Sequence, residues 1–281
     1  MEHITLSNGV AMPVMGFGTY QITDLAQCQQ CVLDAIAAGY RMIDTAQAYY
    51  NEEAVGAALA QCGVAREELF VVTKVHFRNF TPGKCRQSVL ESLEKLRVDY
   101  LDSVLLHWPF NDYYTAWREL EELYEEGLLR SIGVSNFHAD RLIDLINYNK
   151  IAPHIDQIEA HLFCQQKVCR EWMDKYGVTA MAYAPLGQAR RQEMYELPQV
   201  AGPAQKYGKT PAQVMLRFLI QSGFVPIPKS VHAERIKENV KVFDFTLTDA
   251  EMEALGALDT GVAMIGNPEN PVRAEAALHW K

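Results

Sequence analysis

The sequence predicts an α/β protein of the (β/α)8 TIM barrel class. Short apolar segments alternate with amphipathic helical patterns at regular spacing along most of the 281 residues. Consecutive β-then-α units imply parallel strands joined by right-handed crossovers. Eight such units in about 250 residues fit a closed barrel. Because 49% of the residues are hydrophobic, a large core can form, and we expect one barrel domain over residues 1–281.

A doubly wound open sheet is the alternative to a barrel. The dinucleotide fingerprint of such a sheet, GxGxxG, begins at Gly16 and Gly18 but has Gln21 in place of the third glycine. The two glycines are therefore interpreted as a tight backbone turn. The sequence also lacks a Walker A loop, an HExxH motif and a GxSxG motif.

A hairpin is predicted first, because residues 4–6 and 10–12 flank the turn pair Asn8-Gly9. The strand candidates that follow are short apolar segments bounded by turn or polar residues. They are residues 15–18, 40–44, 69–74, 101–107, 131–135, 154–159, 179–183 and 224–227.

Helices are predicted between these strands from the spacing of their apolar residues. Asn51 is expected to cap one helix with its side chain, and Thr210 with Pro211 marks the start of another. Extra helical turns are expected at residues 199–206, before the last strand. The main helical segments are residues 25–38, 51–59, 82–96, 114–126, 141–149 and 211–221.

The composition and the N-terminal sequence argue against several partners and locations. The net charge of −9 argues against nucleic acid as a partner, and no apolar run approaches the ~20 residues of a membrane span. No signal peptide is visible, and six cysteines without a disulfide-like framework suggest reduced thiols in a cytoplasm. The pair Cys28 and Cys31 lies on an amphipathic helix, so Cys28 is interpreted as a core residue rather than as part of a redox or zinc site.

Three successive predicted strands end in residues whose side chains can take part in catalysis. Asp44, Lys74 and His107 follow apolar runs, and Tyr49 comes five residues after Asp44 in a strand-to-helix loop. Strand ends in a barrel share one mouth, so these side chains are expected to meet. An adjacent ammonium is expected to lower the pKa of Tyr49 below its usual value of about 10. Together these four side chains would then be able to protonate a carbonyl oxygen.

These residues carry a resemblance to a known family. Asp44, Tyr49, Lys74 and His107 resemble the catalytic tetrad of the aldo-keto reductases, and residues 39–46, 106–109 and 133–137 are each similar to motifs of that family. The similarity runs from residue 4 to residue 259. It implies a barrel whose bottom is closed by the hairpin, and NADPH-dependent reduction of aldehydes or ketones to alcohols. Tyr49 would be the general acid, assisted by Lys74 and Asp44, while His107 orients the carbonyl.

The same resemblance implies the cofactor site. Ser135, Asn136 and Gln157 would hold the nicotinamide carboxamide, Tyr183 would stack on its ring, and Leu186 lies in the same motif. A second motif at residues 227–239 would form the adenosine 2′-phosphate pocket, which favours NADPH over the more weakly bound NADH. Its residues are Lys229, Ser230, Val231, Arg235, Glu238 and Asn239.

The substrate residues depart from the usual family pattern. Tyr20 and His76 stand where many members carry tryptophan, and Leu162 stands where proline is usual. The segment after Trp108 is short, and so is the tail at residues 266–281. Both features imply an open pocket for small carbonyls such as methylglyoxal, simple aldehydes or keto-sugars, as in the prokaryotic and protozoal branch with its 2,5-diketo-D-gluconate reductases. The expected walls are Tyr20, His76, Phe77, Trp108, Phe110 and Trp280.

Two other functions stay open at this point. One is a non-catalytic NADPH-binding subunit, which Tyr49→Phe would distinguish from an enzyme. The other is a metal- or phosphate-dependent barrel lyase or isomerase with His107, Glu159 and His161 as ligands, although no carboxylate cluster supports it. A small carbonyl is the expected ligand of a monomer, with a dimer as the alternative, and no bound metal is expected.

Overall fold

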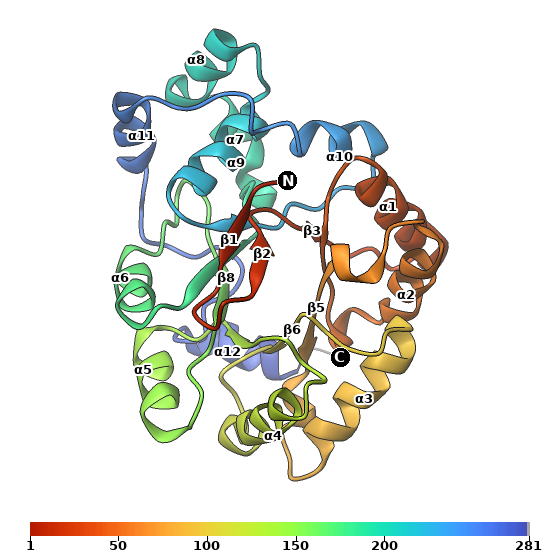
Figure 1. Ribbon diagram of the computed structural model, residues 1–281. Helices are drawn as coiled ribbons and strands as arrows, with labels where there is room; N and C mark the ends of the chain where they lie inside the picture. The colour runs from red at the N-terminus through yellow and green to blue at the C-terminus, as the bar shows by residue number, and fades with distance from the viewer. Residues whose placement is uncertain (280–281) are drawn as a thin grey trace.

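The computed structural model describes residues 1–279 and contains a parallel barrel, as predicted. Its strands pair in the order β10-β9-β8-β7-β6-β5-β4-β3, and every pair is parallel. Figure 1 shows the strands surrounded by helices. The strands are β3 (Phe17–Gly18), β4 (Met42–Asp44), β5 (Phe70–Val75), β6 (Ser103–Leu106), β7 (Ile132–Ser135), β8 (Ile155–Glu159), β9 (Thr179–Tyr183) and β10 (Val225–Pro226).

Gly16 and Gly18 join the first and last strands of the barrel. Gly16 N donates to Pro226 O at 3.1 Å, and Gly18 N donates to Pro228 O at 3.1 Å. A Cβ on Gly16 would lie 2.7 Å from Met42 Cε, and one on Gly18 would lie 3.2 Å from Ile227 O. The two glycines therefore allow the backbones to approach at the seam of the barrel, which explains them without a dinucleotide turn.

The N-terminal hairpin covers the bottom of the barrel. Strands β1 (His3–Thr5) and β2 (Ala11–Pro13) pair antiparallel, with Ile4 opposite Met12. Leu6 and Met12 are almost fully buried and belong to one apolar cluster with inward-facing strand residues. The hairpin crosses in front of the strands in Figure 1. The hairpin thus fills the lower end of the barrel. A functional site is therefore expected at the opposite, upper end.

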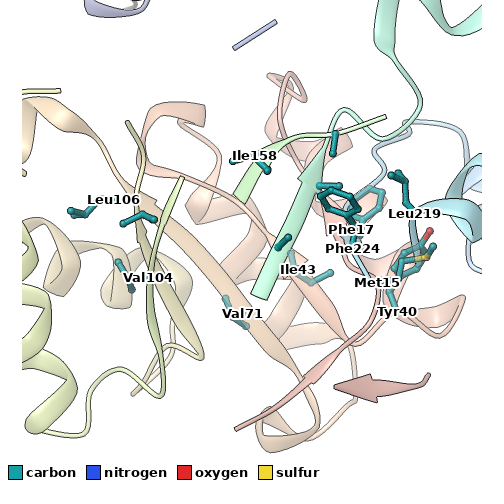
Figure 2. Packing of buried hydrophobic residues seen from close by; sticks show 14 of the residues in the cluster. Met15, Phe17, Tyr40, Ile43, Val71, Val104, Leu106, Ile158, Leu219 and Phe224 are labelled. Atoms are coloured by element: carbon teal, nitrogen blue, oxygen red, sulfur yellow. The ribbon is translucent and has the colours of Figure 1, made fainter. Parts of the chain in front are cut away.

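Helices pack around the strands through a second apolar layer, of which Figure 2 shows Ile43, Val71 and Val104. These residues alternate along each strand with the inward-facing ones, as strand geometry requires. The helices are α1 (Leu25–Ala37), α2 (Glu52–Gln61), α3 (Lys84–Leu96), α4 (Tyr113–Glu125), α5 (Ala139–Tyr148), α6 (Lys167–Tyr176), α7 (Arg191–Tyr195), α8 (Pro198–Tyr207), α9 (Pro211–Gln221), α10 (Ala233–Asn239), α11 (Asp249–Gly256) and α12 (Pro271–Leu278).

Several predicted helix details need correction. Helix α3 begins at Lys84 rather than at residue 82. Asn51 stands at the start of α2, but its side chain makes no capping hydrogen bond there. Helices α11 and α12 were not predicted. Thr210 does cap α9, in a capping box with Gln213.

Cys28 is part of the core, as predicted, and so is Cys31. Cys28 is 0% exposed and Cys31 is 3% exposed, and both lie in the apolar layer beneath α1. Burial, with a smaller contribution from Cys31, raises the pKa of Cys28 to about 12. A thiol held in that state is a packing residue rather than a nucleophile.

Candidate active site

The polar residues at the upper end of the barrel continue the inward faces of their strands. Asp44 lies two residues after the inward-facing Met42, and Lys74 lies two residues after Val72. The same offset relates His107 to Leu105, and strand geometry turns residues at that spacing to one side. Ser135 and Tyr183 end β7 and β9 in the same way, and Gln157 lies two residues after the inward-facing Ile155 of β8.

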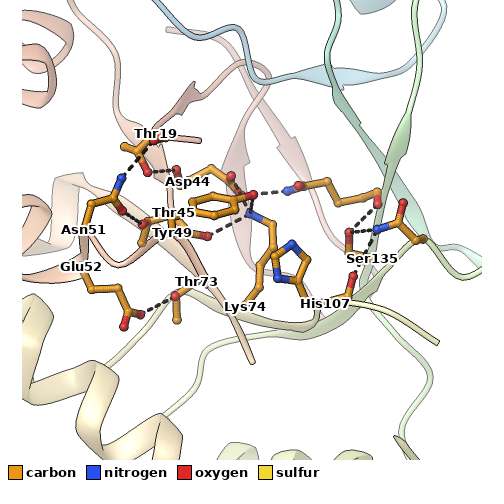
Figure 3. Close-up of polar contacts among 12 residues, drawn as sticks. Thr19, Asp44, Thr45, Tyr49, Asn51, Glu52, Thr73, Lys74, His107 and Ser135 are labelled. Carbon is orange, nitrogen blue, oxygen red and sulfur yellow. Dashed lines mark hydrogen bonds and ion pairs between the residues drawn. The ribbon is translucent and has the colours of Figure 1, made fainter. Parts of the chain in front are cut away.

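Lys74 lies at the centre of the hydrogen bonds shown in Figure 3. Its Nζ lies 2.6 Å from Asp44 Oδ1, 2.9 Å from Thr45 O and 3.4 Å from Tyr49 Oη. Gln157 Nε2 donates to the other carboxylate oxygen, Asp44 Oδ2, at 2.8 Å. Lys74 is 0% exposed. The cost of removing this ion pair from water is offset for both charges, because each has further hydrogen-bond partners.

The loop that carries Tyr49 is held by Asn51, which explains the missing cap. Asn51 Oδ1 accepts from Thr45 Oγ1 at 2.8 Å, and Asn51 Nδ2 donates to Thr19 O and Ile22 O at 3.0 and 3.2 Å. Asn51 therefore ties the Tyr49 loop to the loop after β3, as Figure 3 shows for Thr19 and Thr45. The competition between a cap and a tertiary partner cannot be read from local sequence.

His107 lies beside Tyr49, with ring centroids 5.7 Å apart and planes at 76°. Burial lowers the pKa of His107 well below its usual range, and the positive charge of Lys74 adds to this effect. Burial also lowers the pKa of Lys74, but the charge of Asp44 opposes it. His107 is therefore a neutral imidazole at physiological pH, able to donate one hydrogen bond to a neighbouring oxygen.

The predicted fall in the pKa of Tyr49 is wrong. Burial raises its pKa well above the ordinary value, and the nearby carboxylate of Asp44 adds to the rise. The sequence argument considered the attraction of Lys74 and left out the cost of burying a phenolate. Tyr49 is accordingly a protonated phenol at neutral pH, which is the state a proton donor needs.

A cavity of about 840 Å³ opens above these residues, with Asp44, Tyr49 and His107 in its wall. Ser135 Oγ donates to Gln157 O at 2.8 Å, and Tyr183 Oη donates to Asn136 Oδ1 at 2.7 Å. Asn136 Nδ2 also donates to His107 O at 3.1 Å. Ser135, Asn136, Gln157, Tyr183 and Leu186 all line the cavity.

The residues of the second motif line the same cavity. They are Lys229, Ser230, Val231, Arg235, Glu238 and Asn239. Glu238 is held in place by Thr210, whose Oγ1 donates to Glu238 Oε1 at 2.7 Å. Within residues 1–279, neither Lys229 nor Arg235 forms an ion pair. Two uncompensated cations in an otherwise acidic protein fit an anionic group such as a phosphate.

The expected substrate residues divide into two sets. Tyr20 and Trp108 line the cavity, and the Tyr20 ring lies 5.0 Å from that of Tyr49. His76 and Phe77 are 8% and 4% exposed and do not line it. Their rings lie 4.3 Å apart, and Phe77 packs on Phe110, which does not line the cavity either but stacks on Trp108. Trp280 lies outside the described residues.

Other parts of the cavity wall were not predicted. Arg191 and Tyr195 belong to α7, in the long connection before α9. Ile265, Gly266 and the α12 residue Arg273 come from the tail, which was expected only to be short. The tail thus contributes to the cavity wall. The start signal Asn270-Pro271 was present in the sequence and marks where α12 begins.

Glu159 and His161 do not form the metal site considered above. His161 Nε2 lies 3.0 Å from Glu159 Oε1, and the carboxylate also accepts three backbone N–H groups from residues 264–266. Among residues 1–279 no group of three His, Cys, Asp or Glu side chains is arranged to hold a metal ion. Glu159 is therefore bound to the tail of the chain.

Comparisons with known proteins agree with this geometry. The model of the Aldo/keto reductase family matches residues 14–260. Methylglyoxal reductase DkgA of Yersinia pestis is 42% identical over 269 residues, covering 95% of this chain and 96% of that protein. Glyoxal reductase of Bacillus subtilis is 40% identical with the same coverage. The crystal structure of Bombyx mori aldo-keto reductase in complex with NADP has a TM-score of 0.90 at 35% identity, covering 95% of this chain and 96% of that one. The chain therefore belongs to the aldo/keto reductase family.

Proposed function

We propose that this protein uses NADPH to reduce small aldehydes and α-dicarbonyls to alcohols, with Tyr49 as the general acid. The observation that carries the proposal is the phenol of Tyr49, 3.4 Å from the buried ammonium of Lys74 at the edge of a large cavity. The reductases named above and the NADP complex of a related structure support it. These relatives give no support to a binding-only subunit.

The protein's own groups stabilise charge on the substrate oxygen. NADPH, when bound here, would supply the hydride, and these groups would then face negative charge on the carbonyl oxygen. Tyr49 donates a proton to that oxygen, while the neutral imidazole of His107 donates a hydrogen bond to it. Lys74 stabilises the phenolate that remains, and Asp44 keeps Lys74 charged and in place.

The remaining cavity residues bind and orient the cofactor in this proposal. Ser135, Asn136 and Gln157 hold the carboxamide, and Tyr183 supplies an aromatic face for the ring. Lys229 and Arg235 bind the 2′-phosphate, for which their unpaired charges are suited.

Turnover with a panel of carbonyls tests the proposal. Purified protein should oxidise NADPH in the presence of methylglyoxal, glyoxal or a simple aliphatic aldehyde, and should not do so without a carbonyl. The relatives that reduce methylglyoxal and glyoxal place these two compounds first in the panel. Tight binding of NADPH with no turnover of any carbonyl would contradict the proposal.

The rate of carbonyl reduction should not change over the pH range in which an ordinary histidine titrates. Because burial depresses the pKa of His107 and raises that of Tyr49, both groups keep their active protonation state through neutral pH. We expect kcat/KM for methylglyoxal to show no acid limb near about 6.5, the ordinary pKa of histidine. The profile should fall only on the alkaline side, as Tyr49 loses its proton. An acid limb near 6.5 that disappears in His107→Asn would contradict this assignment.

Arg235 is expected to select NADPH over NADH. Arg235→Ala removes a charge-assisted hydrogen bond to the 2′-phosphate, which NADH lacks. We expect the Kd for NADPH to rise by about 10- to 100-fold, while the Kd for NADH stays nearly constant. Fluorescence titration of each cofactor measures both values.

Lys237 provides the matched control for Arg235. It lies on the same helix, forms an exposed ion pair with Glu234 at 3.2 Å and does not line the cavity. Lys237→Ala should leave both affinities unchanged. An equal loss of NADPH and NADH affinity in Arg235→Ala would remove Arg235 from the 2′-phosphate site.

The proposal includes a monomer that acts in the cytoplasm without a nucleic-acid partner. The net charge of −9 supports the last point, because like charges repel a phosphate backbone. Within residues 1–279 no helix has both the length and the apolar character needed to cross a membrane. Sedimentation velocity at several protein concentrations would distinguish a monomer from a dimer.

A further inference from the structure

Glu159, at the end of β8, holds a segment of the tail that is more than 100 residues away in sequence. Its carboxylate accepts backbone N–H groups from Met264 at 2.6 Å, Ile265 at 2.8 Å and Gly266 at 2.8 Å. His161 Nε2 lies 3.0 Å from Glu159 Oε1. We call residues 264–266 the strap. Glu159 is 1% exposed, so almost all of its interactions are with the protein.

Glu159 is a charged anchor. Burial alone would raise the pKa of its carboxyl group, but the hydrogen bonds from His161 and from the strap outweigh burial and lower the pKa. The carboxylate is therefore ionised at neutral pH. Hydrogen bonds from backbone N–H groups to a buried carboxylate are short and stronger than neutral ones.

The strap reaches the residues proposed to bind nicotinamide. Gly266 is so close to Tyr183 that an added Cβ would lie 2.1 Å from Tyr183 Oη, and 3.2 Å from Asn136 Oδ1. The same Cβ would lie 3.3 Å from Trp108 Cη2. Ile265 and Gly266 both line the cavity. The strap is therefore part of the wall against which Tyr183 and Asn136 pack.

The ends of this part of the tail have anchors of their own. On one side, Thr260 N and Thr260 Oγ1 both donate to Phe163 O, at 3.0 and 2.7 Å. On the other side, His138 Nδ1 lies 2.8 Å from Glu269 Oε1. Loss of Glu159 would therefore release the strap between two points that stay fixed, so a local change is expected rather than loss of the fold.

We propose that Glu159 is a positioning residue that sets the nicotinamide half of the cofactor site, by holding Gly266 against Tyr183 and Asn136. The inference rests on the proposed function, because it takes these two residues as the nicotinamide-binding ones. Glu159 itself touches neither cofactor nor substrate in this proposal; it acts through the strap.

Binding of whole cofactors and of a cofactor fragment tests this role. In Glu159→Ala the Kd values for NADPH and for NADH should rise by a similar factor, about 3- to 30-fold, the usual range for residues that act through a packed neighbour. The Kd for adenosine 2′,5′-bisphosphate, which has no nicotinamide, should not change. Glu159→Gln keeps one acceptor oxygen and should show a smaller rise. A purely structural role would weaken all three ligands together.

Two further variants make the test specific. Gly266→Ala displaces the same contact from the other side, and should weaken NADPH and NADH but not the fragment. Glu121→Ala is the matched control, since Glu121 is 5% exposed and accepts a backbone N–H from Ile151 at 2.7 Å, on α4 and outside the cavity wall. It should lower the thermal midpoint without changing cofactor affinity.

The results separate this inference from the proposed function. Wild-type protein that binds neither NADPH nor NADH would refute the proposed function on which the inference rests. Wild-type protein that binds both, with Glu159→Ala and Gly266→Ala binding them equally well, would overturn the inference alone. An equal loss of affinity for the fragment would also overturn it.

Discussion

Replacing Tyr49 with phenylalanine is expected to lower kcat for carbonyl reduction by about 10²- to 10⁴-fold, the usual contribution of one general acid. The substitution keeps the ring contacts of Tyr49 with Tyr20 and His107. It removes only the hydroxyl that lies 3.4 Å from Lys74 Nζ. The Kd for NADPH should be unchanged, because the proton is needed in the transition state and not for binding.

Tyr50 provides the control for this experiment. It is the neighbouring phenol in the same loop, but it is 72% exposed and does not line the cavity. Steady-state kinetics with methylglyoxal should show normal kcat for Tyr50→Phe, and fluorescence titration should show normal NADPH binding for both variants. Retention of activity in Tyr49→Phe would exclude Tyr49 as the proton donor and leave the family assignment intact.

The barrel was predictable because its signals are local and repeated. Each strand is a short apolar run bounded by turn or polar residues, and each helix has an apolar face, so the order of elements alone selects the architecture. Helix α11 also had such a signal, since Thr248 and Glu251 form a capping box at its start. The closure of the barrel was different, because the contact of Gly16 with Pro226 depends on where distant strands meet.

The meeting of Asp44, Lys74 and His107 was predictable from topology, because all three extend inward faces at one end of the barrel. The electrostatics were not, since the pKa of Tyr49 depends on burial that a strand-end position does not reveal. The partner of Glu159 was equally hidden. Its hydrogen-bond donors include backbone N–H groups in a distant loop, and a backbone group cannot be recognised from the residue type that carries it.

Asp102, just before β6, is an unpredicted charged residue at the other end of the barrel. It is 0% exposed and binds two arginines, with Arg66 Nη2 at 2.7 Å from Oδ2 and Arg130 Nη1 at 2.8 Å from Oδ1. Oδ2 also accepts from Val71 N at 2.9 Å. This carboxylate therefore connects the segment before β5, strand β5 itself and the turn before β7. At the lower end of a barrel such a network contributes to stability rather than to chemistry.

Asp102→Ala is expected to lower the free energy of unfolding by about 3 kcal/mol, the low end of the range for breaking a buried ion pair. The low end applies because the Arg130 side chain is 42% exposed and keeps water after the change, whereas Val71 N loses its acceptor. Thermal unfolding should show a midpoint lower by about 6 to 12 °C. Asp102→Asn retains an acceptor for Val71 N and should lower the free energy of unfolding by a smaller amount. Below the transition, kcat per folded molecule should match wild type, since Asp102 lies at the end of β6 opposite His107. A normal midpoint with reduced kcat would instead make Asp102 part of the active site.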